Sequence, residues 1–151
     1  MSDVIRAKLR CLNETCRYDQ GRHTEFAPVI PKRICGRVEE SGSEENERFW
    51  KASPSGKLQV YFQGPTPYTP GEYYYVDMRP SERSEHAGLW KLEQVAMREG
   101  QMSVSFRLQW DDKRAMRSAD FELTIDNEGV WPAFERKMGS FWDISIISAE
   151  G

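Results

Sequence analysis

The chain has 151 residues, of which 38% are hydrophobic and 30% charged, and its formal net charge is −3. Its aromatic residues (7 Phe, 6 Tyr and 5 Trp) exceed what a disordered chain carries, so we expect a folded domain. No apolar run approaches the ~20 residues that a membrane helix needs. Residues 1–6 lack the pattern of a secretory signal. These features exclude an integral membrane protein with helical spans and predict a soluble protein in the cytoplasm.

The first half of the chain contains four segments in which apolar and polar residues alternate, as they do in half-buried strands. An acidic stretch at residues 39–48 separates the first two segments from the last two and is predicted to be a solvated loop. Pro28 places the second segment at a sheet edge or a bulge. The four predicted strands cover residues 5–12, 24–30, 57–62 and 72–78.

The alternation starts again after a polar stretch at residues 81–86, which we interpret as a hinge. Glu99 and Gly100 suit a tight turn between the next two strands. Residues 131–137 suit a short helical turn or a loop before the last strand. The predicted strands of this second half cover residues 89–96, 102–110, 121–125 and 140–147.

The two halves show a weak internal duplication. Each ends with a strand, a connector that contains proline and an aromatic residue, a glycine and an aromatic strand. If Gly71 and Gly139 correspond, one face of the first aromatic strand (Tyr74, Val76, Met78) matches one face of the second (Trp142, Ile144, Ile146).

Eight short strands predict an all-β fold made of two small related antiparallel units, at residues 1–80 and 87–151. The units are barrel-like or sandwich-like, with an OB-like barrel among the alternatives. They either pack together or close into two adjoining barrels.

The three cysteines, Cys11, Cys16 and Cys35, leave one thiol unpaired and favour a reducing compartment. Together with His23 they offer four possible ligands for a tetrahedral zinc ion. Their spacing is not that of a zinc finger, and Cys11 falls in an alternating segment where a small buried thiol fits. We therefore expect structural cysteines and no metal.

Two motifs stand out. The first, at residues 44–58, contains Glu-Asn-Glu-Arg-Phe-Trp-Lys-Ala-Ser-Pro-Ser-Gly-Lys-Leu, and the second, at residues 71–77, is Gly-Glu-Tyr-Tyr-Tyr-Val-Asp. They resemble small proteins encoded by tailed phages and prophages, which carry Glu-Asn-x-x-Phe-Trp-Lys-x-Thr-Pro-Ser-Gly-x-Leu and then Gly-Lys-x-Tyr-Tyr-Val-Asp-Phe. This chain differs at Ser53, Glu72 and Met78. The resemblance covers at most residues 1–80. It implies a phage or prophage origin, the cytosol of the host bacterium and an all-β fold, but no site residues.

Within the first motif, Phe49, Trp50 and Lys51 lie between the acidic stretch and a proline turn. One interpretation is a ligand platform that combines an aromatic surface with a cation. The other is a strand start whose aromatic residue packs under the turn and is capped by Asn46.

Motifs for catalysis are missing from the sequence. It contains no Gly-x-Gly-x-x-Gly, phosphate loop, Gly-x-Ser-x-Gly or His-Glu-x-x-His. Its two histidines, His23 and His86, both lie in polar surroundings. We expect a binding protein without enzymatic activity and without a cofactor.

Single-stranded nucleic acid is the first candidate ligand, because small β-barrels bind it with exposed aromatic rings and a basic groove. The basic residues cluster near the start of the chain: Arg6, Lys8, Arg10, Arg17, Arg22, Lys32, Arg33 and Arg37. Aromatic candidates for stacking are Tyr61, Tyr68, Tyr73, Tyr75, Trp90 and Trp110. The net charge of −3 argues against a strongly basic surface overall. The alternative is a solvated surface whose arginines pair with the acidic stretch.

A host protein, such as a defence enzyme, is the alternative partner. An exposed aromatic patch at Trp131 and Phe134 would suit such an interface. A third alternative is a minor component of a virion or of its assembly. The binding residues predicted for nucleic acid or a protein partner are therefore Arg6, Lys8, Arg10, Trp50, Lys51, Tyr73, Tyr75, Trp131 and Phe134.

Overall fold

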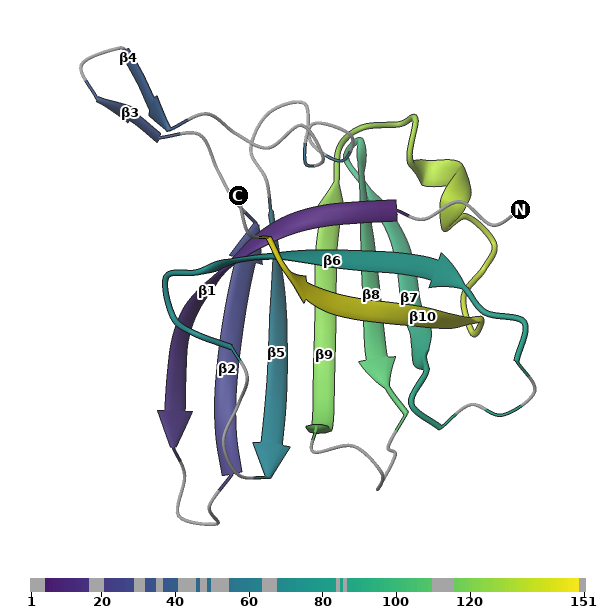
Figure 1. The fold of residues 1–151 in the computed structure, drawn as a ribbon. Coiled ribbons are helices and arrows are strands. Elements are labelled where there is room, and N and C mark those ends of the chain that lie inside the picture. Colours follow the sequence, from purple (N-terminus) through teal and green to yellow (C-terminus); the bar gives the residue numbers. More distant parts are fainter. Residues whose placement is uncertain are drawn as a thin grey trace.

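A computed structural model of the chain describes residues 5–16, 21–28, 32–34, 37–40, 46, 49, 55–63, 68–83, 85, 87–109 and 116–149. The elements are β1 (Ile5–Cys16), β2 (Gly21–Pro28), β3 (Lys32–Ile34), β4 (Arg37–Glu40), β5 (Ser55–Gln63), β6 (Tyr73–Pro80), β7 (Trp90–Arg98), β8 (Gln101–Leu108), β9 (Met116–Ile125), the 3₁₀ helix η1 (Trp131–Ala133) and β10 (Phe141–Ser148). The predicted all-β class is confirmed. Eight strands close into one antiparallel barrel, and the β3–β4 hairpin projects from its side (Figure 1).

All eight predicted strands are present, with boundaries shifted by a few residues. The predicted turn at Glu99 and Gly100 is confirmed, since both residues adopt the positive φ that a tight hairpin turn requires. The hairpin of β3 and β4 was not predicted, and β4 extends into the stretch expected to be a loop. Its short, charge-rich strands lack the apolar alternation that identified the others.

The strand order around the barrel shows how the two halves are related. The first half forms the arc β6-β1-β2-β5, and the second half forms the arc β10-β7-β8-β9. In each arc, three successive strands are neighbours and a fourth returns to lie beside the first, which is the Greek-key arrangement. The arcs meet where β5 pairs with β9 and where β6 pairs with β10.

Of the two arrangements left open for the predicted units, packing together or two adjoining barrels, the structure has the first. The two halves repeat the same topology, but their strands enclose one hydrophobic core within one barrel. The physical reason is the small size of each half. A four-stranded arc cannot bury its apolar face by itself, and it does so by packing against the other arc.

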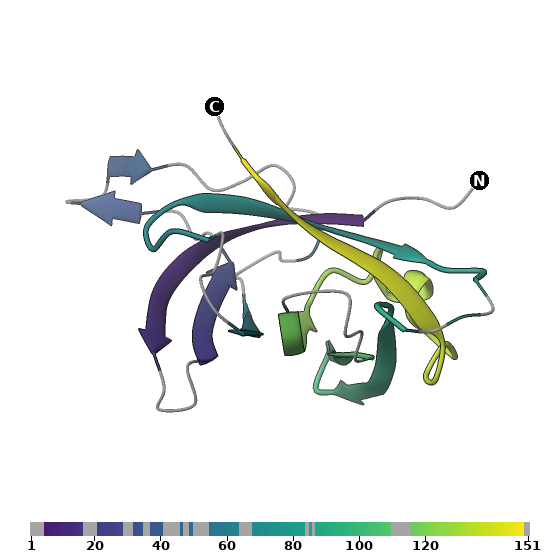
Figure 2. The ribbon, with the colours of Figure 1, turned by 60° about the horizontal axis from the view of Figure 1, so that its bottom comes forward.

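The barrel has two layers whose strands cross. The start of β1 pairs with β6, whereas its end pairs with β2. A bulge between Cys11 and Asn13 lies at this change of partner and increases the bend of the strand. In Figure 1, β6, β10 and the start of β1 cross in front of the upright strands β2, β5, β9, β8 and β7. Figure 2 shows the same two layers from below.

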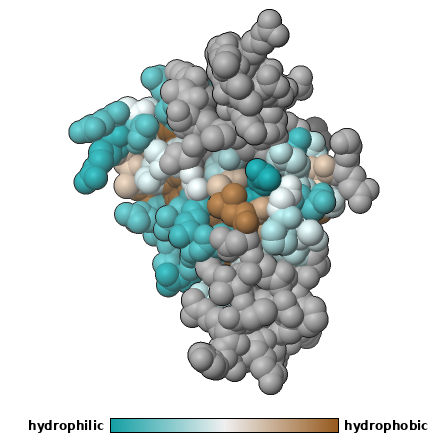
Figure 3. Space-filling model, turned by 90° about the vertical axis from the view of Figure 1, so that its left-hand side faces the viewer, coloured by the Kyte–Doolittle hydropathy of each residue, from teal (hydrophilic) through white to brown (hydrophobic). Residues whose placement is uncertain are grey.

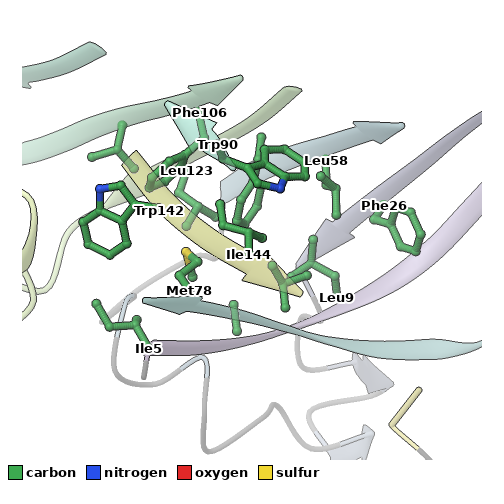
Figure 4. Packing of buried hydrophobic residues seen from close by; sticks show 14 of the residues in the cluster. Ile5, Leu9, Phe26, Leu58, Met78, Trp90, Phe106, Leu123, Trp142 and Ile144 are labelled. Carbon is green, nitrogen blue, oxygen red and sulfur yellow. The ribbon is translucent and has the colours of Figure 1, made fainter. Parts of the chain in front are cut away.

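The core is filled from both halves, and its side chains point into the space between the layers (Figure 4). Each half contributes three aromatic rings in mutual contact. The first cluster has Phe26, Tyr68 and Tyr74, with ring centroids between 5.1 and 5.5 Å apart. The second has Phe106, Phe134 and Trp142, with centroids between 5.2 and 6.1 Å apart.

Gly71 and Gly139 have the same backbone conformation and make equivalent hydrogen bonds. Their φ angles are 91° and 92°, values that favour glycine. The N–H of Gly71 donates to the carbonyl of Cys11 at 2.8 Å, and that of Gly139 donates to Leu92 at 2.7 Å. The N–H groups of Cys11 and Leu92 donate in return to Glu72 and Ser140, respectively. Both halves therefore position their last strand with the same pair of hydrogen bonds.

The repeat extends through the sheet. The bulge in β1 after Cys11 has its counterpart in β7 after Leu92. Cys11 lies opposite Phe26, and Leu92 lies opposite Phe106. The two halves are thus related by a pseudo-twofold rotation that aligns β1 with β7, β2 with β8, β5 with β9 and β6 with β10.

Candidate nucleic-acid interface

Five of the predicted binding residues come together on the outer face of β1 and β6. In the antiparallel register, Arg10 lies opposite Tyr73, Lys8 opposite Tyr75 and Arg6 opposite Asp77. Alternate residues of a strand point to the same side of the sheet, so all six side chains share one face, while Ile5, Ala7 and Leu9 point into the core. The name "basic–tyrosine ladder" is used below for Arg6, Lys8, Arg10, Tyr73, Tyr75 and Asp77.

Cations and rings alternate along the ladder. The Arg6 guanidinium carbon lies 4.4 Å from the centroid of the Tyr75 ring. Lys8 Nζ lies between the two rings, 5.3 Å from Tyr73 and 5.9 Å from Tyr75. The Arg10 guanidinium carbon lies 5.9 Å from Tyr73. These distances fall within the range of cation–π attraction, which holds the long basic side chains against the sheet.

The positive charge of the ladder is concentrated at one end. Arg6 donates to both carboxylate oxygens of Asp77, with distances of 2.6 and 2.8 Å. This bidentate geometry neutralises Arg6 and orients it over Tyr75. Lys8 and Arg10 have no carboxylate partner within ion-pair distance in the described part of the chain. Their charges are therefore available for an anionic ligand.

Hydrogen bonds from a buried side chain fix the backbone of the ladder at Lys8. Asn46 is buried, and its side-chain amide pairs with the backbone of Lys8 as a neighbouring strand would. Its Oδ1 accepts from the Lys8 N–H at 2.7 Å, and its Nδ2 donates to the Lys8 carbonyl at 2.8 Å. Phe49, three residues later, is fully buried in the core. Asn46 therefore binds the first motif to the backbone of β1, and Phe49 packs the same motif into the core.

These contacts bear on the two interpretations of the first motif. The packing of Phe49 in the core agrees with the interpretation of a buried aromatic residue. Two hydrogen bonds of the Asn46 side chain are made with β1, which the sequence interpretation of Asn46 as a cap did not foresee. Trp50 and Lys51, the predicted platform, lie outside the described residues.

Next to the ladder, β10 adds an exposed apolar residue. Ile147 is 42% exposed and lies opposite Tyr75 on β6. Leu12, at the bulge of β1, is also exposed. Figure 3, which views the molecule from the left of Figure 1, shows a small hydrophobic area with hydrophilic residues near it on the same face.

Phe134 was predicted as part of an exposed aromatic patch, and this prediction is wrong. Its side chain is fully buried and stacks on Trp142 at 5.2 Å. Trp131 is half-buried, and its indole N–H donates to the carbonyl of Ile125 at 3.0 Å. The connector has the same role here as in the first half, where it delivers Tyr68 to the core.

Two more aromatic residues considered for stacking lie elsewhere. Trp90 is buried in the core and cannot stack on a base. Tyr61 is half-buried on β5, away from β1 and β6 in the strand order. Trp110 lies outside the described residues.

Sequence reasoning missed Asp77 and Ile147. Asp77 continues the alternation of Tyr73 and Tyr75, which was a usable signal for its place on the ladder. The position of Ile147 depends on the pairing of β10 with β6, two strands far apart in the sequence, and no local pattern reveals it.

The metal hypothesis concerns residues of which only Cys11 has a described side chain. The side chain of Cys11 is buried in the core, as expected for a small thiol in an alternating segment. Cys35 and the side chains of Cys16 and His23 lie outside the described residues. Among the described residues, no group of three or more His, Cys, Asp or Glu side chains could hold a metal ion.

A hollow of about 400 Å³ lies on the outer face of β5, β9, β8 and β7. Its lining includes Lys57 and Glu122 and otherwise consists of small or uncharged residues: Gly56, Gln94, Ser103, Val104, Ser105 and Thr124. Its described lining offers no aromatic ring on which a base could stack, so the ladder is the better candidate for a nucleic-acid site.

Comparisons of the chain with protein-family models, curated proteins and solved structures find no match. In the part of the chain that the structure describes, no helix has the length and apolarity to cross a membrane. The function must therefore be argued from the residues of the ladder.

Proposed function

We propose that the protein binds single-stranded nucleic acid on the basic–tyrosine ladder. The observation that carries this proposal is the comparison of the ladder with the matching positions of the second half. Lys8 corresponds to Leu89, Tyr75 to Asp143 and Asp77 to Ser145. Strand β10 pairs with β6 although it has Asp143 and Ser145 at these positions, so the pairing of β6 with β10 does not require the tyrosine or the aspartate. Leu89 precedes β7 and lies beside β8, so the comparison rests on the outer residues of β6 and β10.

The chemistry of the ladder suits a flexible single strand. Every base offers a π-face that stacks on tyrosine, and arginine adds cation–π attraction. Lys8 and Arg10 are two residues apart on a strand, which places them ~6.7 Å from each other along its axis. Lys8 and Arg10 can therefore contact successive phosphates of an extended strand. The bases attached to this stretch can then stack on Tyr73 and Tyr75.

The acidic net charge restricts this binding to one face. With a net charge of −3, the protein has no general attraction for polyanions. We expect the salt dependence to report only the few phosphates that Lys8 and Arg10 contact. A phage or prophage origin, which the two motifs predict, would place this activity in the cytoplasm of an infected bacterium.

The test is fluorescence anisotropy with labelled single-stranded oligonucleotides at two salt concentrations. We expect binding that weakens with salt. Each neutralised phosphate contact should lower the salt slope by about 1, so the double variant Lys8→Gln/Arg10→Gln should lower it by about 2. Tyr75→Ser should weaken binding about 5- to 150-fold, the loss expected for one stacked base.

The second half supplies a matched control. Lys91 occupies the position that corresponds to Arg10 and lies opposite Phe141, as Arg10 lies opposite Tyr73. Lys91→Gln removes the same charge from the same kind of strand and should leave binding unchanged. Absence of binding at low salt, or equal losses for Lys91→Gln and Arg10→Gln, would overturn the proposal.

A further inference from the structure

A second surface follows from a difference between the two arcs. In the first half, β1 pairs with β6 over six residue pairs, from Ile5 opposite Met78 to Arg10 opposite Tyr73. In the second half, the corresponding strands β7 and β10 form only two pairs, which involve Phe141 and Trp142. Beyond Trp142, no described residue pairs with β10 on the side that faces β7.

The chain before β7 explains why this edge is open. Residues that correspond to the start of β1 follow β8 instead of β10. The N–H of Gly88 donates to the carbonyl of Gln109 at 3.0 Å, and the N–H of Gln109 donates to Leu89 at 2.7 Å. Among the described residues, no strand covers the edge of β10 from Asp143 to Ile146 as β1 covers Tyr75 to Met78 in the first half.

The residues below this edge differ in burial between the two halves. Met78, which lies opposite Ile5, is fully buried. Its counterpart Ile146 points to the same interior but is only partly buried. An apolar residue placed where Ile5 stands in the first half would cover Ile146.

We propose that the free edge of β10 at residues 143–146 binds an extended segment of a protein partner by strand addition. The pseudo-twofold relation specifies this segment, because Ile5–Lys8 occupies the same place on β6. The ligand runs antiparallel to β10 and has the pattern apolar–any–small–basic. Its apolar residue covers Ile146, its small residue lies over Ile144, which is already nearly buried, and its basic residue lies beside Asp143.

The charge on this edge supports the basic position. Asp143 is exposed, and although Arg79 lies opposite it on β6, the two form no ion pair in the described part of the chain. The Asp143 carboxylate is therefore available to a basic residue of the added strand. This surface is distinct from the ladder, and the inference does not depend on nucleic-acid binding.

The probe is a capped peptide of sequence Ile-Arg-Ala-Lys, titrated into isotopically labelled full-length protein and followed by amide chemical shifts. We expect the largest shifts at residues 143–146. The permuted peptide Arg-Ile-Lys-Ala has the same composition and charge, but its faces are exchanged, so it should bind more weakly. Asp143→Asn should weaken binding of the first peptide about two- to fivefold, the loss expected for one cross-strand charge pair.

Three results would contradict the inference. They are equal binding of the two peptides, shifts centred on Tyr75–Met78 instead of β10, and the absence of shifts at millimolar peptide. Asp143→Asn changes only an exposed side chain, so this variant keeps its fold and its spectrum can be compared with that of the unsubstituted protein. The ladder variants Lys8→Gln and Arg10→Gln should bind the peptide normally, which separates this test from that of the proposed function.

Discussion

The two halves of the barrel share their inner faces and differ on their outer faces. Inside, Tyr74 and Val76 correspond to Trp142 and Ile144, and all four are buried. Outside, Tyr75 of the ladder corresponds to the acidic Asp143. The comparison shows that the repeated pattern specifies the backbone through its apolar residues and glycines, whereas the outer positions are free to acquire a binding function.

The same comparison explains the two open places in the barrel wall. The start of β1 lies beyond its pairing with β2, and there the side chain of Asn46 satisfies the backbone of Lys8. The corresponding stretch of the second half does not follow β10, and within the described part of the chain the β10 edge has no partner beyond Trp142. The first half thus has a paired sheet surface that carries cations, whereas in the second half no described residue pairs with the β10 edge beyond Trp142.

Replacement of the buried connector aromatics should give the largest effect. Phe134→Ala removes a fully buried ring that contacts Phe106 and Trp142, so we expect a loss of about 3–5 kcal/mol in the free energy of unfolding. Its counterpart Tyr68→Ala should cost less, because Tyr68 is only half-buried. Urea denaturation of both variants measures the difference.

A surface role for Phe134 makes the opposite prediction. An exposed aromatic residue costs within about 0.5 kcal/mol when replaced. A change of that size for Phe134→Ala would show that the two connectors do not have the same role. It would also contradict the correspondence between the two aromatic clusters.

The comparison also shows which features the sequence could predict. Alternation located all eight barrel strands, because a strand with one face in the core needs apolar residues at every second position. The correspondence of Gly71 and Gly139 was visible because a positive φ restricts the residue type at both places. The same alternation placed Lys8 and Tyr75 on outward faces.

Other features depend on contacts between distant segments. Whether the halves formed one barrel depended on the pairing of β5 with β9 and of β6 with β10, for which no local signal exists. Phe134 was misplaced because its connector contains proline and polar neighbours, which describe an exposed loop and say nothing of a ring that reaches the core. The open edge of β10 is likewise a property of pairing alone.

The paired glycines test the repeat at the level of the backbone. A Cβ atom added at Gly71 or Gly139 would meet no other atom within 4 Å, so any cost comes from the positive φ alone. We expect Gly71→Ala and Gly139→Ala each to lose about 1–2 kcal/mol of stability, with nearly equal values. Thermal or urea unfolding measures this, and Gly129→Ala, at a position without positive φ, is the control.

Very different losses at these two glycines would argue against the repeat. In that case the shared hydrogen bonds to Cys11 and Leu92 would not carry equal weight in the two halves. An equal loss at Gly129 would show that the effect belongs to any loop glycine and not to the left-handed conformation.

The smallest expected effect is a gain in stability at Thr24. Its side chain is fully buried on β2, and its hydroxyl has no hydrogen-bond partner in the described structure. The corresponding position of β8 is Val104, a residue of nearly the same shape without the hydroxyl. Thr24→Val should therefore raise the free energy of unfolding by about 1 kcal/mol, because it removes an unsatisfied buried polar group.

The reciprocal change completes this test. Val104→Thr places a hydroxyl in the corresponding environment of the second half and should destabilise the protein by about 1–3 kcal/mol. Thr24→Ser keeps the hydroxyl and removes only the methyl group, so it should also be destabilising. If Thr24→Val lowered the stability instead, the hydroxyl of Thr24 would have a role in the core that Val104 does not share, and the inner faces of the two halves would be less alike than their backbones.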